Sequence, residues 1–251
     1  MMGYNPYSLE GKTILVTGAS SGIGATTAVE CSKLGASVII TGRNTERLEQ
    51  TFSLLDSSFG ANHKMIVADL TGETSIACLV EQIETLDGMV NNAGVNLVKP
   101  VTFIKQTDME TVFQSNTWAA VNLTRALLKK KKLKKSASIV FTSSVSAFYN
   151  APGRALYASS KAALTSFMRS FAVELAEKGI RANAVHPGLV ETNMMKDNLS
   201  EEELNNNLKE YPLHRFGKPE EVAWAIIYLL SDAAAWVTGT SMVVDGGFML
   251  K

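Results

Sequence analysis

The sequence predicts an α/β protein of one domain, in which a doubly wound, parallel seven-stranded sheet carries helices on both faces. Three observations favour this fold. Short β-branched runs alternate with longer segments of helical periodicity, as in parallel sheets covered by helices. The 251 residues are 46% hydrophobic, which is enough to bury a full core. No composition shift, repeat or linker divides residues 1–251.

The expected elements alternate along the chain. The strands are short apolar or β-branched runs: Thr13–Thr17, Ser37–Thr41, Met65–Ala68, Gly88–Val90, Ser138–Thr142, Arg181–Val185 and Met242–Val244. The helices are the longer segments with apolar spacing between them: Gly22–Leu34, Thr45–Ser57, Glu73–Glu84, Thr107–Leu133, Leu156–Lys178 and Pro219–Leu230. The polar segment 191–217 follows the sixth strand. Ligands of open α/β sheets bind at this edge, so we expect the segment to be a substrate lid.

Composition argues against several classes of partner. The 24 Lys and Arg residues balance 24 Asp and Glu residues, so no overall field attracts nucleic acid or a membrane surface. The longest apolar stretch, Val222–Leu230, is too short to span a bilayer, and we expect a cytoplasmic protein. Cys31 and Cys78 form neither a disulfide framework nor a metal spacing, and we expect both in the core. His63 and His214 also lack metal spacing, so no metal site is predicted.

A glycine-rich turn joins the first strand to the first helix. It reads Thr17-Gly18-Ala19-Ser20-Ser21-Gly22-Ile23-Gly24, a Gly-x-x-x-Gly-x-Gly spacing. Glycines allow a close approach to a pyrophosphate, and the helix start offers free amides. A plain strand-to-helix turn is the alternative, but the position after the first strand favours nucleotide binding. The expected contacts are Gly18, Ser20, Ser21, Gly22, Ile23 and Gly24.

The end of the second strand indicates which dinucleotide binds. No carboxylate stands there to accept a ribose 2′-hydroxyl, and Arg43 could instead pair with a 2′-phosphate. We therefore expect NADP, although Arg43 could simply be solvated and NAD remains the closest rival. Asp69 and Leu70, after the third strand, could contact the adenine; a turn aspartate is the alternative.

Tyr157 and Lys161 lie four residues apart in a segment with helical spacing, so both occupy one helical face. A nearby cation favours the tyrosinate and lowers the phenol pKa from its usual value of about 10. The phenol could then act as a general acid or base near neutral pH. Taken alone, the spacing more often marks a surface contact without a function.

Together with further motifs, these residues resemble the short-chain dehydrogenase/reductase family in its Tyr-x-x-x-Lys form. The resemblance covers nearly all of the chain. Within the family, the chain is similar to the 3-oxoacyl-[acyl-carrier-protein] reductase-like members. The further motifs are Asn91-Asn92-Ala93-Gly94 after the fourth strand, Asn116, Ser144, Pro187-Gly188 and Thr192.

The resemblance implies a Rossmann-like fold and a catalytic set. Ser144 would polarise a carbonyl, and Tyr157 would pass the proton. Lys161 would lower the tyrosine pKa and bind the nicotinamide ribose, while Asn116 would hold a water. The implied further cofactor contacts are Asn92, Ala93, Gly94, Tyr157, Lys161, Pro187, Gly188, Val190 and Thr192.

This implies an NADP(H)-dependent oxidoreductase that reversibly converts a ketone and a secondary alcohol. An NAD-dependent hydroxysteroid or sugar alcohol dehydrogenase is the alternative, and a non-catalytic dinucleotide-binding regulator is a remote one, since fold does not fix function. The residues expected to face the substrate are Val145, Ala147, Phe148, Tyr149, Asn150, Met194 and Met195.

Two partners are also implied. The run Lys129–Lys135, expected to end the long helix, is explained by the helix dipole, but family members dock an acidic acyl carrier protein with basic residues in this region. Lys178 lies near another such place. The segment Trp236–Phe248 and the two long helices resemble family interfaces, which implies a homotetramer with isologous contacts.

Overall fold

The computed structural model describes residues 4–196 and 200–250. Seven parallel strands form one sheet in the order β3-β2-β1-β4-β5-β6-β7. The strands are β1 (Thr13–Thr17), β2 (Ser37–Gly42), β3 (Lys64–Val67), β4 (Leu86–Asn91), β5 (Leu133–Thr142), β6 (Arg181–Pro187) and β7 (Ser241–Val244). The strand order reverses between β1 and β4, where ligands of doubly wound sheets bind.

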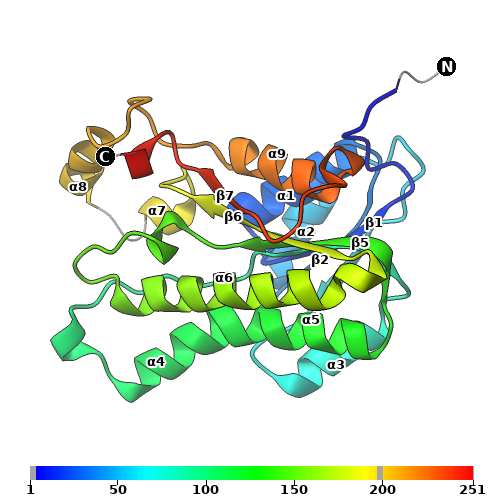
Figure 1. Ribbon diagram of the computed structural model, residues 1–251, viewed down its shortest axis with the longest axis horizontal. Helices are drawn as coiled ribbons and strands as arrows, with labels where there is room; N and C mark the ends of the chain where they lie inside the picture. Colours follow the sequence, from blue (N-terminus) through cyan, green and yellow to red (C-terminus); the bar gives the residue numbers. More distant parts are fainter. Residues whose placement is uncertain (1–3, 197–199, 251) are drawn as a thin grey trace.

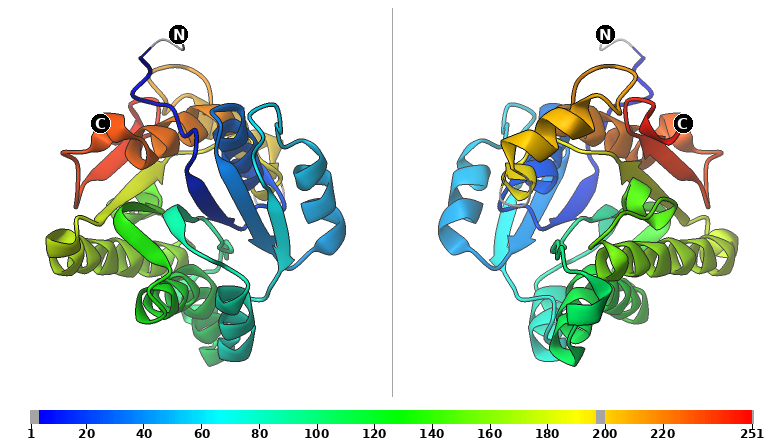
Figure 2. Two further views of the ribbon diagram at one scale, coloured as in Figure 1. Left: turned by 90° about the vertical axis from the view of Figure 1, so that its right-hand side faces the viewer. Right: turned by 90° about the vertical axis from the view of Figure 1, so that its left-hand side faces the viewer.

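Helices cover both faces of the sheet, as Figures 1 and 2 show. One layer holds α1 (Gly22–Lys33), α2 (Thr45–Ser53) and α9 (Pro219–Leu230). The other holds α3 (Glu73–Glu81), α4 (Gln106–Phe113), α5 (Ala119–Lys129) and α6 (Ala155–Leu175). The short helices α7 (Asn193–Lys196) and α8 (Glu201–Leu208) follow β6. The predicted fold class is therefore confirmed.

Alternating strand residues build a core on each side of the sheet. In β1, Ile14 and Val16 pack with the α1 and α9 side, whereas Leu15 packs with α3, α5 and α6. All three are fully buried. Because successive side chains of a strand point to opposite faces, a strand covered on both faces must be apolar throughout. This explains the continuous apolar runs that identify the strands in the sequence.

The predicted helix 107–133 is wrong in two respects. Its middle is a π-helix, η2 (Gln114–Trp118), between α4 and α5. Its last residues are not helical, because α5 ends at Lys129. Leu133 is the first residue of β5 and pairs with Leu86 of β4. Lys131 has a positive φ of 55°, which no helix continues. The remaining predicted helices and strands exist, with ends that differ by a few residues.

The lysine run therefore spans the last residue of α5, a turn and the start of β5. Lys130 pairs with Glu81 at 2.7 Å and Lys134 with Asp87 at 2.8 Å, while Lys132 Nζ donates to the Ile83 carbonyl. The run lies at the amino end of β5, roughly 30 Å along the strand from its carboxyl end. Lys178 follows the corresponding remote end of α6.

The structure also bears on the two cysteines and on membrane-spanning helices. Cys31 is buried, but Cys78 is exposed on α3, so the prediction that it lies in the core is wrong. Both thiols are free. In the described part of the chain, no helix has the length and apolar character needed to cross a membrane.

Candidate active site

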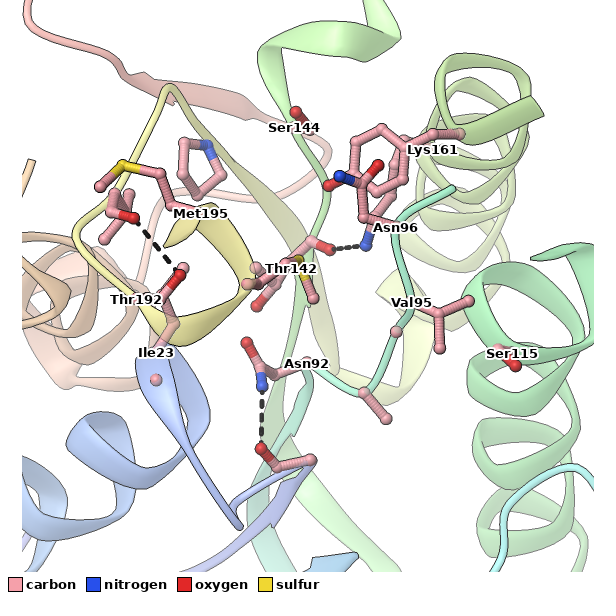
Figure 3. A pocket seen from close by; sticks show the side chains of 18 of the residues that line it. Ile23, Asn92, Val95, Asn96, Ser115, Thr142, Ser144, Lys161, Thr192 and Met195 are labelled. Atoms are coloured by element: carbon pink, nitrogen blue, oxygen red, sulfur yellow. Dashed lines mark hydrogen bonds between the residues drawn. The ribbon is translucent and has the colours of Figure 1, made fainter. Parts of the chain in front are cut away.

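A cleft of about 490 Å³ lies along the carboxyl edge of the sheet. Residues from the loops after all seven strands line it, and Figure 3 shows several of them. The predicted site residues that line the cleft are Gly18, Ser20, Ser21, Gly22, Ile23, Arg43, Asp69, Leu70, Asn92, Ala93, Gly94, Ser144, Tyr157, Lys161, Pro187, Gly188, Val190 and Thr192. Gly24 and Asn116 are outside this lining and support it through contacts described below.

The glycine turn forms a tight cradle at one end of the cleft. Gly18 has a positive φ of 63°, and a Cβ there would stand 2.8 Å from the Ala93 Cα. A Cβ on Gly24 would collide with the Gly18 carbonyl oxygen. The side chain of Ser21, the N-cap of α1, makes no capping hydrogen bond. Because the amides at this helix start have no side-chain cap, the cradle fits a negatively charged group such as the pyrophosphate of a dinucleotide.

A hydrogen-bonded junction joins this cradle to the loop after β4. The Thr17 hydroxyl donates to the Val90 carbonyl at 3.2 Å and accepts from the amides of Asn92 and Ala93 at 2.9 and 3.1 Å. In return the Asn92 Nδ2 donates to the Thr17 and Gly18 carbonyls at 3.2 and 3.3 Å. These hydrogen bonds therefore fix the distance between the glycine turn after β1 and the loop after β4.

Two arginines line the cleft beyond the end of β2. Arg43 follows the strand, and Arg47 lies in the first turn of α2. Asn44 caps this helix by accepting from the Arg47 amide at 2.8 Å. Across the cleft, hydrogen bonds from Thr71 and, to a lesser extent, the charge of Arg43 lower the pKa of the Asp69 carboxyl. This end of the cleft is suited to an anionic group. Sequence reasoning missed Arg47, although its spacing from Arg43 was visible.

Ser144 and Tyr157 meet at the other end of the cleft. The Ser144 hydroxyl accepts from the Ser146 amide at 3.1 Å, and it forms a hydrogen bond with Tyr157. Burial raises the pKa of Tyr157, while the Ser144 hydrogen bond and the charge of Arg154 oppose the rise. Burial wins, so the phenol is protonated at neutral pH. The expected lowering of its pKa by Lys161 is absent from this structure.

The position of the Lys161 ammonium explains this difference. Its Nζ lies 5.8 Å from the centroid of the Tyr157 ring and donates to the Thr142 carbonyl at 2.8 Å, a contact drawn in Figure 3. The side chain is only 4% exposed. Because burial penalises the charged form, the pKa of Lys161 falls to about 8.

The π-helix η2 places Asn116 beside this pair. The Asn116 Oδ1 accepts from the Val95 amide at 2.7 Å, and its Nδ2 donates to the Val95 carbonyl and the Ser160 hydroxyl at 2.9 and 3.0 Å. A Cβ on Gly94 would lie 3.0 Å from the Asn116 Oδ1 and 3.5 Å from the Lys161 Nζ. Asn116 therefore connects the loop after β4 with α6. Single π-helical turns inside α-helices are frequent at functional sites.

Ser143, which lines the cleft, and His186, which does not, support the segment around Ser144. The Ser143 hydroxyl donates to the Lys161 carbonyl at 3.1 Å and contacts Thr165, so it supports α6. His186 is buried, with its Nδ1 3.0 Å from the Ser144 carbonyl oxygen. Its ring lies 4.5 Å from that of Phe148. Both side chains thus hold the segment that carries Ser144.

An aromatic wall closes the substrate end of the cleft. Phe248 lies between Tyr149 and Tyr211, with ring centroids 5.3 and 5.1 Å away. The Tyr211 hydroxyl accepts from the Leu189 amide at 2.7 Å. The expected substrate-facing residues Val145, Tyr149, Met194 and Met195 line the cleft, whereas Ala147, Phe148 and Asn150 do not. Sequence reasoning missed Tyr211 and Phe248, which are distant from the motifs along the chain.

Segment 191–217 borders this end of the cleft. It contains α7 and α8, and Asn207 of α8 lines the cleft. Part of it, residues 197–199, lies outside the described residues, and its function as a lid stays a prediction. Within residues 4–196 and 200–250, no three His, Cys, Asp or Glu side chains group so as to hold a metal ion.

Known proteins resemble the chain over nearly its whole length. A family model described as Enoyl-(Acyl carrier protein) reductase matches residues 18–249. The 3-oxoacyl-[acyl-carrier-protein] reductase FabG of Thermotoga maritima is 37% identical over 248 residues, which cover 96% of this chain and 99% of that protein. The enzyme of the same name from Rickettsia prowazekii is 36% identical over 242 residues, covering 96% and 98%.

Solved structures show the same architecture. A 7 alpha-hydroxysteroid dehydrogenase complexed with NADH and 7-oxo glycochenodeoxycholic acid has a TM-score of 0.91 at 28% identity, covering 98% of both chains. A putative gluconate dehydrogenase from Agrobacterium tumefaciens has a TM-score of 0.89 at 30% identity, covering 98% of this chain and 99% of that one. Similar architecture therefore accompanies different substrates.

The buried ammonium leads to a stability prediction. Lys161 should lose its proton near pH 8 in the folded protein but only near pH 10.4 in the unfolded chain. Between these values the unfolded state binds more protons, so the contribution of Lys161 to the free energy of unfolding should rise by about 1.4 kcal/mol per pH unit. Urea unfolding of the wild type and Lys161→Met between pH 7 and 10 measures it as the difference between the two curves. A difference that is constant with pH would contradict this shift.

Proposed function

Because this chain belongs to the short-chain dehydrogenase/reductase family, we propose that it is an NADPH-dependent carbonyl reductase, reversible as an alcohol dehydrogenase. The family relationship makes it an oxidoreductase of ketone and secondary alcohol groups with a nicotinamide cofactor. One observation carries the proposal. A serine hydroxyl, a protonated phenol and a buried lysine lie together in the cleft that begins at the glycine cradle.

The side chains have separate tasks in this proposal. A bound nicotinamide cofactor would supply the hydride. The Ser144 hydroxyl would hold the carbonyl oxygen, and the Tyr157 phenol would donate its proton to the same oxygen as the alcohol forms. Lys161 would hold the ribose hydroxyls with the N–H groups that do not face Thr142. Asn116 would keep the loop after β4 in place, and the water predicted beside it stays a prediction.

The adenosine end of the cleft supports NADP as the cofactor. Arg43 and Arg47 both line it, and a guanidinium can pair with a 2′-phosphate. The first turn of α2 adds a positive helix end. An NAD-dependent enzyme would need a carboxylate at the end of β2, where the sequence reads Thr41-Gly42-Arg43-Asn44.

The relatives suggest substrate classes to test. A 3-oxoacyl thioester on an acyl carrier protein is the first, because the curated relatives are named for it. Keto-steroids and keto-sugar acids follow, from the names of solved relatives. The lysine run lies at the end of the sheet remote from the cleft, so a carrier docked there would not reach the cleft of the same subunit. Equal, salt-insensitive turnover of a free ketone and its carrier-linked form would contradict carrier docking.

A non-catalytic regulator remains the alternative of another class. Such a protein needs the dinucleotide cradle but no serine–tyrosine pair aimed into the cleft. The presence of that pair favours an enzyme. A screen of NADPH oxidation against carrier-linked ketones, keto-steroids, keto-sugars and diketones separates the two, since a regulator oxidises NADPH with none of them.

Removing the phenol hydroxyl should stop the reaction. In Tyr157→Phe we expect turnover to fall by about 10²- to 10⁴-fold, the usual contribution of a general acid. The dissociation constant of NADPH, measured by its fluorescence, should change little. Tyr228→Phe is the control, because it removes a hydroxyl on α9, outside the cleft. Full activity in Tyr157→Phe would sink the mechanism.

Removing the Arg43 guanidinium should reduce the preference for NADPH. In Arg43→Ala we expect the dissociation constant of NADPH to rise about 10- to 100-fold, the value of a lost charge-assisted hydrogen bond, with a much smaller change for NADH. Calorimetric titration with both cofactors measures this. Arg47→Ala tests which guanidinium matters more. If neither variant weakens NADPH binding, the cofactor assignment is wrong.

We expect a homotetramer in the cytoplasm. Large apolar side chains are exposed on two surfaces, Trp118 and Val173 on the α5–α6 side and Trp236, Val243 and Leu250 near β7. Two such surfaces suit two isologous interfaces. Light scattering at micromolar concentration should give the mass of four chains, and a monomeric mass would defeat the prediction. Cell fractionation tests the location.

A further inference from the structure

A second cation lies at the catalytic end of the cleft. Arg154 is the N-cap of α6, three residues before Tyr157, and lines the cleft with Asn96. Its Nη1 donates to the Asn96 Oδ1 at 3.1 Å, and the side chain is partly buried. Figure 3 shows Asn96 on the loop after β4, in the same part of the cleft as Ser144 and Lys161. The guanidinium is thus held near the reacting groups by a neutral amide.

Among the residues that the structure describes, no carboxylate forms an ion pair with this guanidinium. Its charge does reach one acid of the described residues, Glu203 on α8, and adds to the hydrogen bonds from Ser200 that lower the pKa of that carboxyl. The Glu203 carboxylate is already engaged, because its Oε2 accepts from the Ser200 amide and hydroxyl, both at 2.8 Å. Within residues 4–196 and 200–250, the Arg154 guanidinium therefore has a neutral hydrogen-bond partner but no ion-pair partner.

The charges that line the cleft are unevenly divided. Of the described residues that line it, four are positive, Arg43, Arg47, Arg154 and Lys161, and Asp69 is negative. Arg43 and Arg47 lie with Asp69 at the adenosine end, and Lys161 donates to the Thr142 carbonyl. Arg154 is therefore the guanidinium available to a substrate held against Ser144 and Tyr157.

We propose that Arg154, oriented by Asn96, binds a carboxylate of the substrate, so that this enzyme acts on keto acids and hydroxy acids. The inference rests on the proposed carbonyl reductase function and specifies its substrate class. A guanidinium offers a planar pair of N–H donors that matches a carboxylate. The carboxylate must lie within a few bonds of the ketone, because Arg154 precedes Tyr157 by less than one helical turn. A neutral ketone or thioester would leave the guanidinium unpaired.

The test compares keto acids with their own methyl esters. A series with two to four carbons between ketone and carboxylate is assayed for kcat/KM with NADPH, in the wild type, Arg154→Gln and Arg154→Lys. We expect the wild type to prefer at least one acid over its ester by about 10- to 100-fold, the value of a hydrogen bond between charged groups. Arg154→Gln, which can still donate to Asn96, should lose this preference, and Arg154→Lys should keep part of it.

Two results would overturn the assignment. One is a wild-type preference for the esters throughout the series, which needs no variant to be folded. The other is an equal loss for acids and esters in Arg154→Gln, which would mean a structural role. In both cases turnover of a ketone leaves the proposed reaction standing. Absence of NADPH oxidation with every acid, ester and other ketone would overturn the reaction and the assignment together.

Discussion

Backbone groups that leave a parallel sheet at its carboxyl edge have no neighbouring strand to pair with, and side chains must pair with them instead. In this chain Thr17 serves the loop after β4, Asn116 serves both polar groups of Val95, and Lys161 serves the last carbonyl of β5. The polar side chains that stabilise the edge are thus the same ones that line or support the cleft. Structural and functional demands on these positions cannot be separated by burial alone.

The sequence predicts best what depends on local spacing. The glycine turn and the Tyr157–Lys161 pair are short-range patterns, and the fold follows from the regular alternation of elements. The sequence does not predict the contacts between segments that are distant along the chain. The pairing of Leu133 with Leu86 extends β5 into what looks like a helix, and Asn96 meets Arg154 across 58 positions. The sequence also predicts a lowered pKa for Tyr157, whereas burial, which depends on the whole fold, raises it.

The two cations near the reacting phenol differ in how they respond to burial. A lysine ammonium gives up its proton when desolvation is strong enough, and the pKa of Lys161 accordingly falls to about 8. A guanidinium is delocalised and more weakly hydrated than an ammonium, and burial in a protein does not remove its charge. The charge of Lys161 therefore depends on pH in a way that the charge of a guanidinium does not. When the Lys161 ammonium loses its proton, the guanidinium can still attract an anion to this end of the cleft.

The π-helix η2 has a consequence for how this chain can vary over evolutionary time. A π-helical turn holds one residue more than the same stretch of α-helix, so the loss of one residue from segment 114–118 would convert it to regular α-helix and remove the wide turn that carries Asn116. The Asn116 amide would then leave Val95 and Ser160, although composition and helical propensity would hardly change. Substitutions on the outer surface of α4 and α5 are free of this restriction, whereas insertions and deletions are not. In this part of the protein, chain length itself is a functional property.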